Sequence, residues 1–164
     1  MATAVDPLEF RRVMGHFPTG VTVLTTVHEG RRHGMTANSV TSVSLEPVLI
    51  LVCLMREART GLAIQKARRF GVNILREDQE HISRRFGIAG QDHFEGLEVE
   101  EDESGLPRLP GCTAYLVCRV TELVPAGDHD VVLAEVERAH AYGGNPLVFH
   151  LGGYKRLPGM GRLG

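Results

Sequence analysis

Two long apolar runs separated by a four-residue turn constrain the fold of this chain more than any other feature. The first run extends from Gly111 to Val124, and the second extends from His129 to Ala141. The intervening Pro-Ala-Gly-Asp, residues 125–128, has the composition of a turn. The continuous apolar character of the second run would also suit a helix, but its β-branched residues are dense and turns flank it. We therefore expect a long antiparallel hairpin.

Shorter segments also carry strand patterns, with β-branched or apolar residues between turn signals. These segments are residues 21–27, 33–37, 48–54, 70–75 and 147–151. A polar turn containing Gly30 makes the first two segments a hairpin. The run at 48–54 is apolar almost without interruption, so we expect it to be a strand buried on both faces.

Three short helices are expected between the strands. In the first, Asp6, Pro7 and Glu9 supply a capping residue, a first-position proline and a first-turn acid. This helix carries an apolar stripe at helical spacing and ends at Pro18. The stripe consists of Phe10, Val13, Met14 and Phe17.

The other two helices are expected at residues 60–67, with Leu62, Ile64 and Ala67 facing inward, and from 78 or 79 to about 86. Residues 87–105 form a polar excursion that His93, Phe94 and Leu97 should attach to the body. Six or seven strands joined mostly by hairpins favour a mainly β chain with short helices. We expect an antiparallel barrel with helices at its ends rather than a βαβ sheet.

Length and composition narrow the function classes. The chain has 164 residues, which suits one domain, and we expect residues 1–157 to form it, followed by a loose Gly-rich tail at 158–164. A net charge of −2 offers no basic surface for nucleic acid or a membrane. No apolar stretch reaches the roughly 18 residues of a membrane helix, and no signal segment opens the chain, so a cytoplasmic location is expected.

Residues 34–54 contain the most unusual composition in the chain. Six hydrogen-bonding side chains fall within ten residues, directly before the apolar run at 48–54: Thr36, Asn38, Ser39, Thr41, Ser42 and Ser44. Buried in a core, each would cost about 1–3 kcal/mol if it lacked a partner. A flat ligand with a polar edge would supply such partners, and an exposed Ser/Thr-rich loop would need none. The residues alone leave both interpretations open.

Several common site motifs do not occur. The sequence contains no GxGxxG after a strand, no phosphate loop of the GxxxxGK[ST] type and no GxSxG elbow. The eight histidines follow no metal-binding spacing, so no metal site is expected. Cys53, Cys112 and Cys118 match neither a zinc site nor a disulfide framework and are expected to be free thiols.

Five segments, in this order, resemble the short-chain flavin reductases, which are the reductase halves of two-component monooxygenases. The segments are FPTGVTVLTT (Phe17–Thr26), GMTANSVTSVSLEPVLILVCL (Gly34–Leu54), RFGVNIL (Arg69–Leu75), GDHDVVLAEV (Gly127–Val136) and PLVFHLGGY (Pro146–Tyr154). Together they cover nearly the whole chain. The resemblance implies an FMN-binding split barrel with Greek-key-like antiparallel strands, usually a homodimer.

The resemblance also implies an activity. An NAD(P)H:flavin oxidoreductase of this kind transfers hydride to FMN or FAD, uses NADH or NADPH as co-substrate, and supplies reduced flavin to a partner monooxygenase. A non-catalytic flavin-binding module and an FMN-dependent oxidase on the same barrel are the alternatives. The preferred flavin and nicotinamide stay open, as does whether the flavin is a bound cofactor or a diffusible substrate.

The same resemblance implies which residues bind the flavin. The ring edge is expected to contact the polar segment, that is Thr36, Ala37, Asn38, Ser39, Val40, Ser42, Val43 and Ser44. Cys53 and Leu54, which end the apolar run, should pass beside the ring. Arg59 and Thr60 are expected at the phosphate, where Ala58 replaces the serine that the family commonly has. Without that hydroxyl, phosphate affinity should be weaker.

Three further residues complete the expected site. His129 is the expected catalytic residue, because the matching histidine in the family lies against the flavin and the nicotinamide. Tyr154 should help to shape the nicotinamide side, although a tyrosine after two glycines would equally suit a core position. Phe86 is expected either in the core of its helix or as a lid over the ring.

Overall fold

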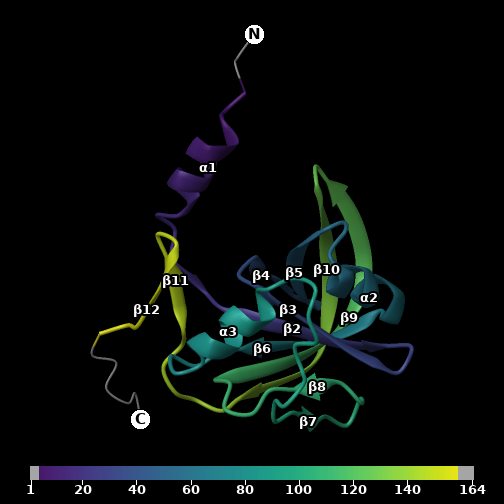
Figure 1. Ribbon diagram of the computed structural model, residues 1–164. Helices are drawn as coiled ribbons and strands as arrows, with labels where there is room; N and C mark the ends of the chain where they lie inside the picture. The colour runs from purple at the N-terminus through teal and green to yellow at the C-terminus, as the bar shows by residue number, and fades with distance from the viewer. Residues whose placement is uncertain (1–3, 159–164) are drawn as a thin grey trace.

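The computed structural model describes residues 4–158 (Figure 1). Seven strands form the main sheet in the order β3-β2-β6-β9-β10-β5-β4, and every neighbouring pair is antiparallel. The chain is therefore mainly β and antiparallel, as the sequence predicts. The seven strands are β2 (Thr22–His28), β3 (Arg31–Ala37), β4 (Val40–Leu45), β5 (Val48–Met55), β6 (Arg69–Ile74), β9 (Ala114–Ala126) and β10 (His129–Ala141).

Smaller elements surround this sheet. A three-stranded sheet contains β1 (Thr19–Gly20), β11 (Val148–His150) and β12 (Gly153–Lys155), and a two-stranded one contains β7 (Glu100–Glu101) and β8 (Pro107–Arg108). The helices are α1 (Pro7–Met14), α2 (Arg59–Ala67) and α3 (Glu80–Phe86). Beyond Pro158, the tail expected at 158–164 lies outside the described residues. No helix within residues 4–158 has the length and apolar character needed to cross a membrane.

The long hairpin is present as predicted. Strands β9 and β10 pair from Ala126 opposite His129 to Ala114 opposite Ala141, with two irregularities in register. The hairpin extends past the neighbouring strands of the main sheet in Figure 1. Strands β3 and β4 form the two opposite edges of the main sheet. They are nevertheless consecutive in the chain, and only Asn38 and Ser39 separate them.

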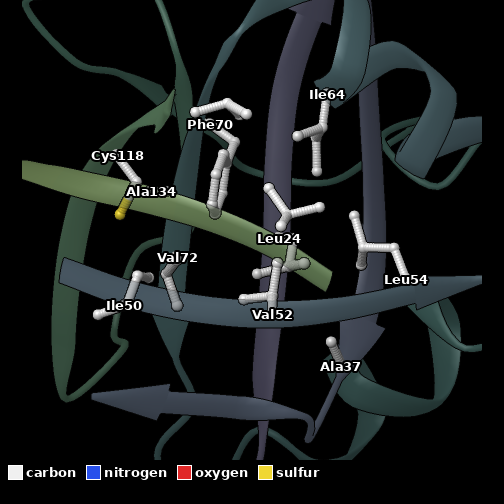
Figure 2. Packing of buried hydrophobic residues seen from close by; sticks show 12 residues of the cluster. Leu24, Ala37, Ile50, Val52, Leu54, Ile64, Phe70, Val72, Cys118 and Ala134 are labelled. Atoms are coloured by element: carbon white, nitrogen blue, oxygen red, sulfur yellow. The ribbon is translucent and has the colours of Figure 1, made fainter. Parts of the chain in front are cut away.

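The main core lies on one face of this sheet. Side chains of β2, β5, β6, β9, β10 and α2 converge there, as Figure 2 shows. The cluster comprises Leu24, Ala37, Ile50, Val52, Leu54, Ile64, Phe70, Val72, Cys118, Val120, Val132 and Ala134. Fully burying one such Val, Leu or Phe side chain contributes about 1.5–3 kcal/mol to stability.

Strand β5 is less buried than its sequence predicts. Ile50, Val52 and Leu54 are buried in the core, whereas the alternate residues Leu49, Leu51 and Cys53 are half-buried. The expectation of burial on both faces was wrong for this single chain. The strand belongs to an antiparallel sheet, in which helices need not cover both faces.

A second cluster packs beneath α3. Ile82 and Phe86 of the helix belong to one buried cluster with Val23, Leu75 and Leu147, and Phe94 and Leu97 pack against this cluster. The excursion at 87–105 is therefore attached to the body through the predicted residues Phe94 and Leu97.

Helix α1 stands apart from the main sheet in Figure 1. Its start is as predicted, because the Asp6 carboxylate accepts a hydrogen bond from the Leu8 amide at 3.1 Å and Pro7 occupies the first turn. No residue of the helix is buried, however. Phe10, Val13 and Phe17 of the apolar stripe are 57%, 54% and 67% exposed. The stripe therefore has no partner within the described chain.

Candidate functional site

The connection between β3 and β4 is fixed against the end of β5. The Ser39 hydroxyl donates to the Cys53 carbonyl at 2.8 Å, and the Cys53 amide donates to the Ser39 carbonyl at 3.2 Å. These two reciprocal bonds hold the connection between β3 and β4 against β5. The polar segment and the end of β5 therefore lie side by side.

The start of α2 is joined to the same region. The Thr60 hydroxyl donates to the Gly34 carbonyl of β3 at 3.0 Å. Burial, followed by the nearby charge of Arg59, lowers the pKa of His33 in the same strand. The N-cap residue of α2 is Ala58, which provides no side-chain cap. The N–H groups of the first turn, next to the Arg59 cation, can therefore donate hydrogen bonds to an anion.

Hydrogen bonds to Ser83 connect β3 and β12 with α3. The Thr36 hydroxyl donates to the Ser83 carbonyl at 2.6 Å. The Ser83 hydroxyl in turn lies 2.7 Å from the Tyr154 hydroxyl. Tyr154 therefore belongs to the same network as the polar segment, although 118 residues separate it from Thr36.

His129 begins β10 directly after the turn at the tip of the long hairpin, opposite Met55 at the end of β5. Its Nδ1 atom lies 2.7 Å from the Asp128 carboxylate, and its side chain is 39% exposed. That hydrogen bond is the main reason why the pKa of Asp128 is lowered. With Nδ1 engaged by the carboxylate, Nε2 is the ring nitrogen left to meet a ligand.

Asp130 attaches this turn to α2. Its carboxylate accepts from Arg56 Nε at 3.3 Å and from Gln65 Nε2 at 3.0 Å. The Arg56 amide also donates to the Asp128 carbonyl at 3.3 Å. The loop that leads into α2 and the turn that carries His129 are thus held as one unit. No sequence motif marks Asp130 for this role, because its partners come from distant segments.

The hydroxyls of the polar segment are satisfied differently from the sequence expectation. Thr36, Ser39 and Thr60 each donate their proton to a main-chain carbonyl of this chain. A ligand is therefore not needed to satisfy them, and toward a ligand they can act only as acceptors. Asn38 is exposed, and its side chain makes no hydrogen bond within residues 4–158. Unlike the Thr36 and Ser39 hydroxyls, its amide can therefore donate to a ligand.

The remaining predicted residues divide into buried and exposed groups. Ala37 and Leu54 belong to the main core, and Phe86, at 2% exposure, belongs to the cluster beneath α3. Of the two alternatives for Phe86, this chain therefore shows the core position rather than a lid. On β4, Val40 is half-buried and Val43 is exposed.

The two other serines of β4 lie apart from the hydroxyl network. Ser42 is exposed, and Ser44 accepts a hydrogen bond from the Glu46 amide at 3.2 Å. Two cavities, of about 150 and 240 Å³, lie outside the predicted site, near Gln79 and Arg108 respectively.

Comparisons with known proteins bear on this arrangement. The family model described as "Flavin reductase like domain" matches residues 14–158. The chain belongs to this family.

Two curated relatives carry informative descriptions. This family member is 43% identical over 148 residues to the reductase component of a 4-nitrophenol 4-monooxygenase/4-nitrocatechol 2-monooxygenase from Rhodococcus opacus, covering 90% of this chain and 80% of the relative. It is 44% identical over 132 residues to an NADH:riboflavin 5′-phosphate oxidoreductase from Streptomyces pristinaespiralis, covering 79% and 75%. Both alignments cover most of the two chains being compared.

A solved structure gives the same result for the fold. The NADH:FAD oxidoreductase SgcE6 of Streptomyces globisporus C-1027, in complex with NAD and FAD fragments, matches this flavin reductase family member with a TM-score of 0.90 and 36% identity. The match covers 98% of this chain and all of that one. The resemblance found in the sequence segments is therefore confirmed at the level of the family.

Proposed function

We propose that this chain is an NAD(P)H:flavin oxidoreductase that reduces FMN or FAD by hydride transfer and supplies the reduced flavin to a partner monooxygenase. Membership of the flavin reductase family and the named activities of its relatives support this function. The single structural observation that carries it is the convergence of the polar segment, the end of β5, the start of α2 and the His129 turn. Hydrogen bonds connect each of these segments to its neighbour.

The donors and acceptors of the site fit the edge of an isoalloxazine ring. That ring, when bound, accepts a hydride at N5 from a nicotinamide. The Asn38 amide and main-chain N–H groups of the polar segment would donate to ring carbonyls and would stabilise negative charge after reduction. The Thr36 and Ser39 oxygens, whose protons are already used, would accept from a ring N–H. Half-buried Cys53 lies next to this edge through its bonds with Ser39.

The beginning of α2 fits the phosphate group. Arg59 supplies a cation, and the first-turn amides at a helix N-terminus favour an anion. The Thr60 hydroxyl donates to Gly34, so it would position this turn and accept rather than donate. Because Ala58 offers no hydroxyl, the phosphate would be held less tightly, which suits a flavin that leaves after reduction. Ser42, Val43, Ser44 and Val40 would border the ring from β4.

His129 and Tyr154 would face the nicotinamide. Each is anchored by a neighbouring side chain, His129 by Asp128 and Tyr154 by Ser83, so each presents a defined polar group. Since hydride transfer needs no general acid, their role would be to hold the two rings within about 3–3.5 Å of each other.

We further propose that the main sheet is the split barrel of this family and that residues 1–157 act as one domain. The two-residue connection between the edge strands β3 and β4 supports the split-barrel form. We also propose a homodimer, because within residues 4–158 the apolar stripe of α1 is exposed and the outer face of β5 is only half-buried. A second copy would cover both surfaces.

An assay of NADH and NADPH oxidation, each with FMN and with FAD, tests the function. We expect absorbance of the nicotinamide to fall only when flavin is present, with one combination clearly fastest. Absence of flavin-dependent oxidation with either nucleotide would end this proposal. A yellow protein inert to both nucleotides would instead favour a flavin-binding module, and oxygen uptake that depends on an organic substrate would favour an oxidase.

A further inference from the structure

Ser83 is a buried polar residue that the proposed reaction does not use directly. It lies in the middle of α3 and is 1% exposed. Serine is a weaker helix former than alanine, and a buried hydroxyl destabilises a fold unless it is hydrogen-bonded. An alanine would therefore suit this position better if packing alone mattered. The hydroxyl is explained by its partner.

That partner is Tyr154, which is 71 residues further along the chain. The two hydroxyl oxygens are 2.7 Å apart, and either can be the donor. The main-chain carbonyl of Ser83 has a separate role, since it accepts both from Gly87 N at 3.0 Å and from Thr36 Oγ1 at 2.6 Å. One residue thus contacts the proposed flavin side through its main chain and the proposed nicotinamide side through its side chain.

The other contacts of Tyr154 hold its ring but not its hydroxyl. The ring meets Phe149 edge to face at 5.4 Å between centroids, and the Arg84 guanidinium lies 4.9 Å from its centroid. Arg84 is itself paired with Glu80 at 2.7 Å. Neither contact involves the Tyr154 hydroxyl. Among the described contacts, only the bond to Ser83 links the Tyr154 side chain by a hydrogen bond to the main body.

We infer that Ser83 is a positioning residue that sets the affinity for the nicotinamide nucleotide by fixing the Tyr154 hydroxyl. This inference rests on the proposed function. Ser83 touches neither substrate in this arrangement and acts through Tyr154. Because the Thr36 bond uses the Ser83 carbonyl, removing the hydroxyl leaves the flavin side intact.

The Ser83→Ala variant tests this separation. We expect the KM for the preferred nicotinamide to rise about three- to tenfold, the range expected for one neutral hydrogen bond, while the KM for flavin changes less than twofold. Tyr154→Phe should reproduce the effect, and the double variant should add little to either single change, because both remove the same bond. Ser83→Thr keeps the hydroxyl and should restore most of the affinity.

A matched control separates positioning from stability. Thr113→Val removes another buried hydroxyl, which donates to the Ile74 carbonyl at 3.1 Å outside the site network. It should lower the melting temperature without changing either KM. If Ser83→Ala behaved in the same way, with an unchanged KM for the nicotinamide, the inference would be wrong. If Ser83→Ala failed to fold, Tyr154→Phe would decide the question from the other partner.

Failure of the proposed function would look different. Equilibrium dialysis measures NADH binding directly. If the wild-type protein bound NADH but did not reduce flavin, the proposed reductase function would be wrong. The same dialysis would still test the role of Ser83 in nicotinamide affinity, since Ser83→Ala should weaken NADH binding by the same three- to tenfold. Wild-type protein with no measurable affinity for NADH or for NADPH would overturn both proposals.

Discussion

At the scale of single residues, a substitution of His129 tests the proposed mechanism most directly. We expect His129→Ala to reduce nicotinamide turnover about tenfold or more, because a small misplacement of the two rings is enough to slow hydride transfer by that much. Flavin binding should be largely kept, since the polar segment and α2 are unchanged. Steady-state turnover and a flavin titration measure the two effects separately.

His140 provides the control for this substitution. It lies on the same strand, β10, and its exposed ring stacks near Tyr142 away from the β5 end. His140→Ala should therefore leave turnover and flavin affinity unchanged. Equal turnover in His129→Ala and wild type would remove His129 from the mechanism.

Gly34 tests how closely β3 approaches α3. A Cβ at this position would lie 2.5 Å from Phe86 Cε1 and 3.1 Å from Phe94 Cζ, so the packed rings would have to move. We expect Gly34→Ala to destabilise the fold by about 1–3 kcal/mol through overpacking. Urea unfolding measures this change in the free energy of unfolding. Gly20→Ala is the control, because no atom lies within 4 Å of its Cβ, and a loss comparable to that of Gly34→Ala would contradict the packing explanation.

Individual side chains show where sequence reasoning succeeds and where it stops. The clustering of hydroxyls in residues 36–44 is visible in the sequence, but the carbonyls that accept from Thr36 and Ser39 belong to Ser83 and Cys53. Such pairings depend on tertiary structure and leave no local pattern. The same is true of Phe86, whose helical spacing fits either a core or a lid until its neighbours are known.

At the scale of elements, the residue that ends α2 has an unfavourable backbone conformation, and a substitution can relieve it. Arg68 follows the helix with φ 61° and ψ 7°, the left-handed conformation that glycine adopts at little cost. We expect Arg68→Gly to stabilise the protein by about 0.5–1 kcal/mol, after subtracting the loss of a long 3.3 Å bond from Arg68 to the Val120 carbonyl. Thermal and urea unfolding measure the gain.

The neighbouring arginine serves as the comparison for that variant. Arg69 begins β6 and pairs with Arg119 in the ladder, so Arg69→Gly should destabilise instead, because glycine weakens a strand. If both variants lost stability equally, the left-handed conformation of Arg68 would not be the cause.

Elements with strong end signals were predicted well, and those held by distant pairing were not. The capping pattern placed the start of α1 correctly, although the helix ends at Met14 and not at Pro18, and the turn between β9 and β10 placed their hairpin. By contrast, Leu62 of α2 was expected inward but is 43% exposed, because Ala63 and Ile64 form the buried side. Strand β12 is three residues long, and only its pairing with β11 makes it a strand.

At the scale of the whole molecule, the sequence predicts the strand pattern but not the order of the strands in the sheet. The order β3-β2-β6-β9-β10-β5-β4 brings the end of β5 beside β10, which joins Cys53 and Met55 to the His129 turn. No local periodicity contains this information. The resemblance to flavin reductases is what placed Cys53 and His129 in one expected site.

The apolar stripe of α1 leads to the last prediction, that the protein is a dimer in which α1 packs on a second copy. Phe10 and Val13 are exposed on a helix none of whose residues is buried. Exposed apolar groups gathered on one element are typical of an interface. Replacing both with glutamate should place two charges in that interface and produce monomers. Sedimentation velocity would measure the change, and the KM for flavin should rise if the interface borders the site.

A control on the same helix decides whether charge or the interface is responsible. Glu9 and Arg12 form an exposed ion pair at 2.6 Å, which contributes little to stability in such a setting. The Glu9→Gln, Arg12→Gln variant should therefore stay dimeric, with the same concentration dependence of its melting temperature as wild type. A wild-type monomer, or a dimer that survives the two glutamates unchanged, would show that the stripe does not contact a second copy.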